Sequence, residues 1–197
     1  MFLFFISQVA FSDEKQFLIW GDKPIRVWRR KGNRFDANYT RKTMQSKRGI
    51  MVWLALKADG TSRLIRLTRT LDSAAYQQDI LTPALSFIKG TRTTRGRVYF
   101  QQDNAPPHFS RSTTRFLAEK GVCMLADWPP DLNVAENAWA AILRELVGKS
   151  FPTEDVLWAA IQVAWQKVPA SFVRKLWDSI PRRLEGVRRA RGAATRC

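Results

Sequence analysis

Seven consecutive apolar residues at positions 50–56, IMVWLAL, constrain the fold of this chain more than any other segment. A continuous apolar run of this length is typical of a strand that is buried on both faces. Turn residues follow at 58–60, and the alternating segment 63–67 is expected to return as a second strand. Helices must cover the faces of such a sheet, so the sequence predicts an α/β fold.

The remaining segments complete an alternation of strands and helices. Strands are expected at residues 9–20, 98–102 and 122–126, and helices at 72–88, 110–120, 133–147 and after the capping residue Thr153. In the last of these helices, one apolar face is expected to contain Val156, Leu157, Ala160, Ile161, Ala164 and Trp165. This order predicts a mixed five-stranded sheet flanked by helices, in a single domain that spans residues 1–197.

The chain is strongly basic, with 33 Lys and Arg against 17 Asp and Glu and a net charge of +16. An excess of this size favours a polyanionic partner, and nucleic acid is the first candidate because binding to phosphates releases counterions. A ribosomal or otherwise basic surface protein is the alternative. The charge gathers in an insertion at about 21–49 and in a helical tail at about 181–197.

These two basic segments supply the candidate DNA contacts. The residues are Arg26, Arg29, Arg30, Lys31, Arg34, Arg182 and Arg183. Aromatic side chains interleave with the charges of the insertion, and a loop of this length is usually functional or disordered. A solvated loop and a contact with a partner subunit are the alternatives for the insertion.

Several classes of site are not supported by the composition. One His and two Cys, without a CxxC pair, indicate neither a zinc site nor a disulfide framework. The apolar residues 1–6 are too short to cross a membrane and lack a basic flank, and no other run approaches that length. The sequence also contains no Gly-rich phosphate loop. We expect no membrane partner and no small-molecule substrate.

Two acidic residues stand in apolar strand-like segments, Asp13 between Phe11 and Phe17 and Asp103 after residues 98–102. A carboxylate in such surroundings is costly unless it pairs with a cation. Mg²⁺ takes carboxylates together with water and phosphate oxygens, and two such ions can clamp both oxygens of a phosphoryl transfer. Turn formation is the structural alternative for Asp103, because Asn, Ala and two Pro follow it.

Glu136 is the third candidate acid, although its spacing alone favours a structural role. With Asn133 as N-cap, Glu136 would stand at the third helical position and form a capping box. His108 is a candidate general base, but a single His in a turn is more often a structural hydrogen-bonding residue.

Three segments resemble the acidic motifs of the mariner superfamily of DNA transposases: FSDE at 11–14, QQDNAPPH at 101–108 and WPPDLNVAENAW at 128–139. Further similarity lies at 27–30, 51–53, 59–60 and 179–183. The resemblance implies a ribonuclease-H-like fold with Asp13, Asp103 and Glu136 as catalytic acids that hold Mg²⁺ or Mn²⁺, in a site of two ions. The supporting candidates within these motifs are Asn104, His108 and Asn137.

The resemblance also implies cut-and-paste chemistry, in which water hydrolyses a strand at the transposon end and the freed 3′-hydroxyl attacks target DNA. It implies DNA as partner, a homodimer and a nuclear location. Catalysis in such a scheme depends on positioning and charge neutralisation, because no covalent protein intermediate forms.

Departures from the family pattern motivate a second hypothesis. Family members carry an N-terminal DNA-binding region, whereas this sequence begins almost at its first acidic strand. The turn before Glu136 is about two residues shorter than expected and could displace its helix, and Val134-Ala135 replaces the usual Pro-Ile. The alternative is therefore a truncated or decayed transposase copy that binds DNA without cutting it. A ribonuclease H or an integrase core fits the motifs less well.

Overall fold

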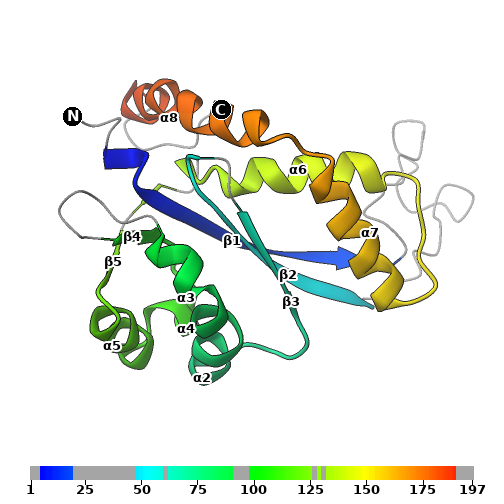
Figure 1. Cartoon of the computed structure of the whole chain (residues 1–197), viewed down its shortest axis with the longest axis horizontal. Coiled ribbons are helices and arrows are strands. Elements are labelled where there is room, and N and C mark those ends of the chain that lie inside the picture. Colours follow the sequence, from blue (N-terminus) through cyan, green and yellow to red (C-terminus); the bar gives the residue numbers. More distant parts are fainter. Residues whose placement is uncertain are drawn as a thin grey trace, which may run out of the picture.

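Five strands form one mixed sheet in the order β3-β2-β1-β4-β5 (Figure 1). The structure is a computed structural model that describes residues 5–19, 48–59, 62–90, 98–125, 128–129 and 132–189. The strands are β1 (Val9–Leu18), β2 (Gly49–Leu56), β3 (Ser62–Leu67), β4 (Val98–Gln101) and β5 (Val122–Met124). β1, β2 and β3 pair antiparallel, whereas β1, β4 and β5 pair parallel. The predicted five-stranded mixed sheet is thus confirmed.

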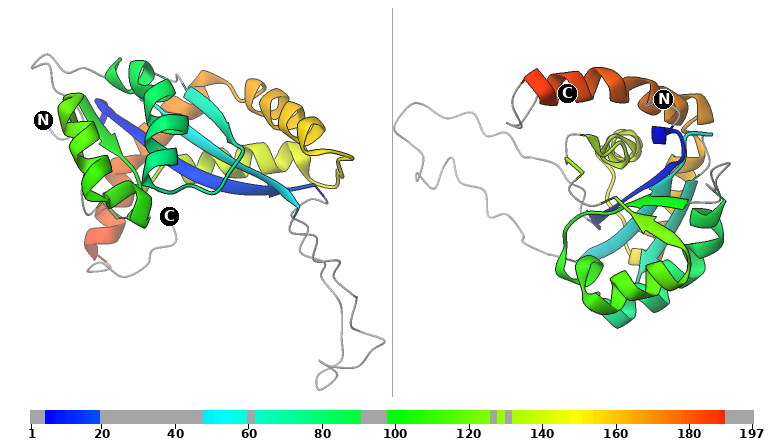
Figure 2. Two further views of the ribbon diagram at one scale, coloured as in Figure 1. Left: turned by 90° about the horizontal axis from the view of Figure 1, so that it is seen from below. Right: turned by 90° about the vertical axis from the view of Figure 1, so that its left-hand side faces the viewer.

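Helices cover both faces of this sheet (Figure 2). One face carries α2 (Ser73–Ala75), the π-helical segment η2 (Tyr76–Leu81), α3 (Thr82–Lys89), α4 (Pro106–Phe109) and α5 (Arg111–Glu119). The other face carries α6 (Ala135–Leu146), α7 (Glu154–Gln166) and α8 (Ala170–Arg189). Each face therefore has its own apolar core.

The alternation of side chains along β1 divides its residues between the two cores. Val9, Phe11 and Phe17 pack with the helices α6, α7 and α8, whereas Ala10 packs on the opposite face with α3 and α5. Because successive side chains of a strand point to opposite faces, Asp13 falls on the side of α6 and Glu14 on the other side. This division decides which partners each carboxylate can reach.

Local caps begin several helices where the sequence predicts them. Asp72 accepts a hydrogen bond from the backbone N–H of Ala75 at 2.7 Å, and Thr153 accepts one from Val156 at 3.3 Å. Ser110 caps α5 in the same way, by accepting from Thr113 at 3.2 Å. Short side-chain acceptors satisfy N–H groups that have no partner inside the helix.

The structure departs from the sequence prediction at three helical positions. The helix expected at 72–88 contains the π segment η2, in which the hydroxyl of Thr82 donates to the carbonyl of Gln77 at 2.7 Å. Val156 is 45% exposed, so its expected place on the buried face of α7 is wrong. Residues 181–189 of the predicted tail are helical, but they belong to the longer helix α8, which begins at Ala170 and continues through Pro181 to Arg189, and residues 190–197 lie outside the described part.

The basic insertion expected at about 21–49 lies almost entirely outside the described residues. The same is true of five of its candidate DNA contacts, Arg26, Arg29, Arg30, Lys31 and Arg34. Within the part of the chain that the structure describes, no helix is both long enough and apolar enough to cross a membrane.

Candidate functional site

Asp13 points from β1 toward α6, where the indole N–H of Trp139 donates to its Oδ2 atom at 2.7 Å. Trp139 is only 4% exposed, and its ring packs against Phe17 with the ring centroids 5.7 Å apart. Burial raises the pKa of Asp13 to about 6 although the Trp139 hydrogen bond lowers it, and the negative charges of Glu136 and Glu14 raise it further. The site thus holds a carboxylate whose charge is poorly compensated.

The start of α6 is tied directly to β1 beside Asp13. The side-chain N–H of Asn133 donates to the carbonyl of Ser12 at 3.1 Å, and its Oδ1 accepts from the backbone N–H of Ala135 at 3.0 Å. The Ser12 hydroxyl in turn donates to the carbonyl of Gln101 on β4 at 2.9 Å. One buried asparagine therefore connects the middle of the 128–139 motif to the first acidic strand.

Glu136 stands at the second position of α6, because the helix begins at Ala135 and its N-cap is Val134. The capping box predicted between Asn133 and Glu136 is therefore wrong in its positions: the asparagine amide bridges β1 and Ala135 instead. Glu136 is exposed, and its negative charge raises the pKa of Asp13. The shortened turn has not removed α6 from β1.

Asp103 stands two residues after the end of β4, at the same level along the sheet as Asp13 of the neighbouring strand β1. Phe11 pairs with Gln101 between the parallel strands β1 and β4, so both acids stand two residues beyond one pair. Its Oδ1 atom accepts from the backbone N–H of Ala105 at 2.9 Å and lies 2.5 Å from Nδ1 of His108. The hydrogen bond from His108 is the main reason that the pKa of Asp103 is lowered.

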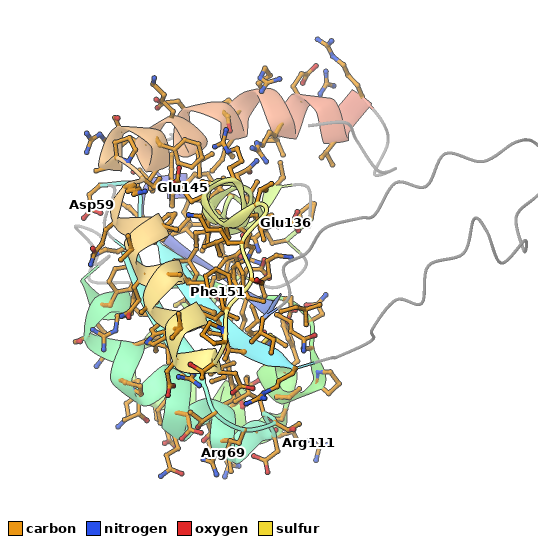
Figure 3. All side chains as sticks on the ribbon, turned by 90° about the vertical axis from the view of Figure 1, so that its right-hand side faces the viewer. Asp59, Arg69, Arg111, Glu136, Glu145 and Phe151 are labelled. Carbon is orange, nitrogen blue, oxygen red and sulfur yellow. The ribbon has the colours of Figure 1, made fainter. Side chains whose placement is uncertain are left out.

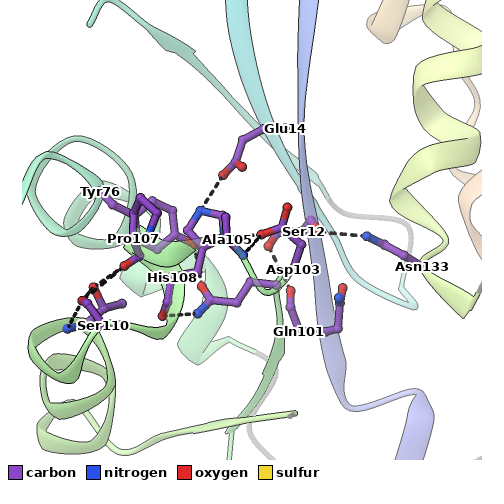
Figure 4. A network of polar contacts seen from close by, with 12 residues as sticks. Ser12, Glu14, Tyr76, Gln101, Asp103, Ala105, Pro107, His108, Ser110 and Asn133 are labelled. Carbon is purple, nitrogen blue, oxygen red and sulfur yellow. Dashed lines mark hydrogen bonds and ion pairs between the residues drawn. The ribbon is translucent and has the colours of Figure 1, made fainter. Parts of the chain in front are cut away.

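His108 lies between Asp103 and Glu14 (Figure 4). It is 3% exposed, and its Nε2 atom lies 3.3 Å from Oε1 of Glu14. Burial alone would lower the pKa of His108, but the hydrogen bonds and charges of the two carboxylates outweigh it and raise the pKa to about 9. Both ring nitrogens face carboxylate oxygens, an arrangement that favours the protonated ring, in which both N–H groups donate.

One atom each from Glu14, Asp103 and His108 falls within 4.8 Å of the others, a spacing that a metal ion could use. In this structure both ring nitrogens of His108 face carboxylate oxygens, so the three side chains form a hydrogen-bonded cluster. Glu14 is not among the site residues that the sequence predicts. Its signals were its place in the FSDE motif and next to Asp13 on the opposite face of a strand, which a surface residue would share.

The other predicted residues have different surroundings. Asn104 is exposed next to Asp103. Asn137 accepts a hydrogen bond through Oδ1 from Nη2 of Arg183 at 2.7 Å, and Nε of Arg183 donates to Ser179 at 2.9 Å. Arg183 is 8% exposed, so in this structure it connects α8 to α6 and does not face solvent as a DNA contact would. Arg182 is exposed, as such a contact requires.

The sheet order and the helices on both faces define a ribonuclease-H-like domain, and comparison with solved structures agrees. A Mos1 transposase paired-end complex with the left transposon end matches with a TM-score of 0.75 and 19% identity, over 97% of this chain and 57% of that chain. A Mos1 transposase catalytic domain with Raltegravir and Mg matches with a TM-score of 0.68 and 17% identity, over 96% and 86%.

Curated sequences identify the family. The Tcb2 transposase of Caenorhabditis briggsae is 34% identical over 95% of this chain and 69% of its own length. The Tc1 transposase of Caenorhabditis elegans is 33% identical over 94% of this chain and 68% of its own length. The chain belongs to the Tc1/mariner family of transposases. No family model matches the sequence.

Proposed function

We propose that this chain is a transposase catalytic domain that cuts and joins DNA strands with the help of divalent cations. Its membership of the Tc1/mariner family supports a role in DNA transposition. The observation that carries the catalytic proposal is the environment of Asp13, a partly buried carboxylate whose pKa is raised by burial and by the charge of Glu136.

The donor set fits a hard divalent cation. Asp13, Asp103 and Glu136 offer carboxylate oxygens, which Mg²⁺ and Mn²⁺ prefer. Two bound ions would supply charge neutralisation and an acidic water for phosphodiester hydrolysis. Two Mos1 catalytic-domain structures with Mg and with Mn share this fold.

The residues of the chain itself provide the positioning. Trp139 fixes one oxygen of Asp13, and Asn133 holds the first turn of α6 against β1. Such fixed geometry is where enzymes of phosphoryl transfer gain most of their rate. Asp103 is held by Ala105 and His108 at the end of the neighbouring strand.

The partner in this proposal is DNA, namely transposon ends and a target duplex, and the place of action is the nucleus. The net charge of +16 supports binding to a polyanion. One Mos1 structure is described as a paired-end complex, which motivates the proposal of a homodimer for this chain as well.

A nicking assay on supercoiled plasmid, with Mg²⁺ or Mn²⁺, tests the catalytic proposal. We expect Asp13→Asn, Asp103→Asn and Glu136→Gln each to abolish nicking. Glu145→Gln is the matched control, because Glu145 lies on the opposite side of the same helix, α6, and pairs with Lys167 (Figure 3). Equal nicking by the wild type and all variants would contradict the proposal, as would no nicking with any divalent ion.

The same charge also supports a second function, DNA binding without cleavage, as expected of a decayed copy. That function predicts sequence-independent binding that weakens steeply with salt. Binding of this kind by a wild type that never nicks DNA would favour it over the catalytic proposal.

A further inference from the structure

We infer that His108 is a positioning residue for Asp103, and that Glu14 holds His108 in place. The chain Glu14–His108–Asp103 would fix the carboxylate of Asp103 so that Oδ2 faces a cation. This inference rests on the proposed function, because it assigns Asp103 the role of a metal ligand.

The hydrogen bonds of Asp103 are divided unequally between its two oxygens. Oδ1 takes both contacts, the one from Ala105 and the one with His108. Among the described residues, Oδ2 has no hydrogen bond, and the side chain is 53% exposed. The protein thus anchors one oxygen and leaves the other accessible for a ligand.

Asp103 needs such an anchor because the backbone alone does not hold it. β4 ends at Gln101, and Asp103 stands beyond the last paired residue of the sheet. Asp13, in contrast, lies within β1 and pairs with Leu54 of β2. A side-chain contact must therefore fix Asp103 relative to Asp13.

The Glu14 contact makes that connection. Glu14 is the neighbour of Asp13 on β1, and its carboxylate reaches Nε2 of His108 from the opposite face of the sheet. The His108 ring thus joins the loop that carries Asp103 to the strand that carries Asp13. The arrangement resembles the outer partners that orient metal ligands in known sites.

The His108 ring is itself held on several sides. Its ring lies against Tyr76 with the centroids 4.2 Å apart, and its carbonyl accepts from Nε2 of Gln102 at 2.9 Å. The Tyr76 hydroxyl donates to Oε1 of Gln102 at 2.6 Å, which closes the network. Tyr76 begins the π segment η2, a type of irregularity that is frequent at functional sites.

Two amide substitutions, each of which replaces one ring nitrogen of His108, separate positioning from a general structural role. In His108→Asn, the amide N–H takes approximately the place of Nδ1 and can still donate to Asp103. In His108→Gln, the amide N–H takes approximately the place of Nε2 and can donate only to Glu14. Both variants lose the ring packing on Tyr76, so a purely structural role predicts similar losses for both.

The inference predicts that His108→Gln lowers Mn²⁺ affinity and nicking by roughly 10- to 100-fold, as for other outer partners of metal ligands. His108→Asn should lose clearly less Mn²⁺ affinity and less nicking than His108→Gln, while the two variants have similar melting temperatures. Glu14→Gln should fall between them. Equal losses in His108→Asn and His108→Gln would overturn the inference.

A spectroscopic measurement tests the geometry without any metal. His108 is the only histidine, so its two ring nitrogens give unambiguous ¹⁵N signals in the full chain. We expect Asp103→Asn to shift mainly the Nδ1 signal and Glu14→Gln mainly the Nε2 signal. An Nδ1 signal that does not respond to Asp103→Asn would refute the positioning contact. A wild type with these shifts that binds no Mn²⁺ would instead refute the proposed function.

Discussion

The substitution Asp13→Asn should stabilise the folded protein at neutral pH while it removes the proposed activity. Burial raises the pKa of Asp13 to about 6 from its ordinary value of 3.8. Each tenfold change in acidity corresponds to about 1.4 kcal/mol, so the charged carboxylate costs up to about 3 kcal/mol of folding free energy. Asparagine is isosteric and uncharged, and its Oδ1 can still accept from Trp139.

The pH dependence follows from the direction of this pKa change. The folded state binds the proton of Asp13 more tightly than the unfolded state, so the wild type loses stability as pH rises between about 3.8 and 6. Below this window the carboxyl is neutral in both states, and the advantage of Asp13→Asn should vanish. Above it, the advantage should stay constant at about 1–3 kcal/mol.

Urea unfolding at a series of pH values, without divalent ions, measures this difference through the midpoint concentration. Asp178→Asn is the control, because this carboxylate is exposed on α8 and its removal should change stability by less than about 0.5 kcal/mol. Adding Mg²⁺ should stabilise the wild type but not Asp13→Asn. Equal stability of the wild type and Asp13→Asn at pH 7.5 would refute the reasoning, and so would a difference that does not depend on pH.

Four further substitutions probe the site and its surroundings. Trp139→Phe removes the N–H that lowers the pKa of Asp13. The loss of stability with rising pH that Asp13 causes should therefore extend to higher pH, which urea unfolding measures. Arg183→Met should cost about 1–3 kcal/mol, because the part-buried Oδ1 of Asn137 loses its donor. Arg182→Ala should leave stability nearly unchanged but weaken DNA binding. In titrations at several salt concentrations, the slope of the logarithm of the binding constant against that of the salt concentration should fall by about one. Asn133→Ala should cost about 1–3 kcal/mol and reduce nicking, and a fully active variant would show that α6 needs no tie to β1.

Local sequence patterns were sufficient to predict most of the secondary structure. The run at 50–56 became the buried strand β2, and Asp72, Ser110 and Thr153 cap their helices. These features depend on neighbours within a few residues, which a sequence pattern records directly. Residues 20–47, with most of the predicted basic insertion, lie outside the described part, so the predictions there stay open.

Other expectations failed because their outcome depended on residues far away in the chain. The sequence predicts that Asn133 caps a helix with Glu136, but its amide bonds Ser12, 121 residues earlier. Arg183 reads as part of a basic surface, yet packing of α8 against α6 buries it against Asn137. No local pattern marks either contact, since both form only when the helices dock.

The candidate site shows the same division. The sequence alone determined that Asp13, Asp103 and Glu136 stand in three acidic motifs, and that two of these acids belong to strands or their ends. Only the tertiary structure decided which partner each carboxylate of the site meets. Trp139 reaches Asp13 across 126 residues, and Glu14 faces His108 because alternation along β1 turns it away from Asp13. Local hydrogen bonding and periodicity set the elements, whereas burial and charge between distant segments set the chemistry.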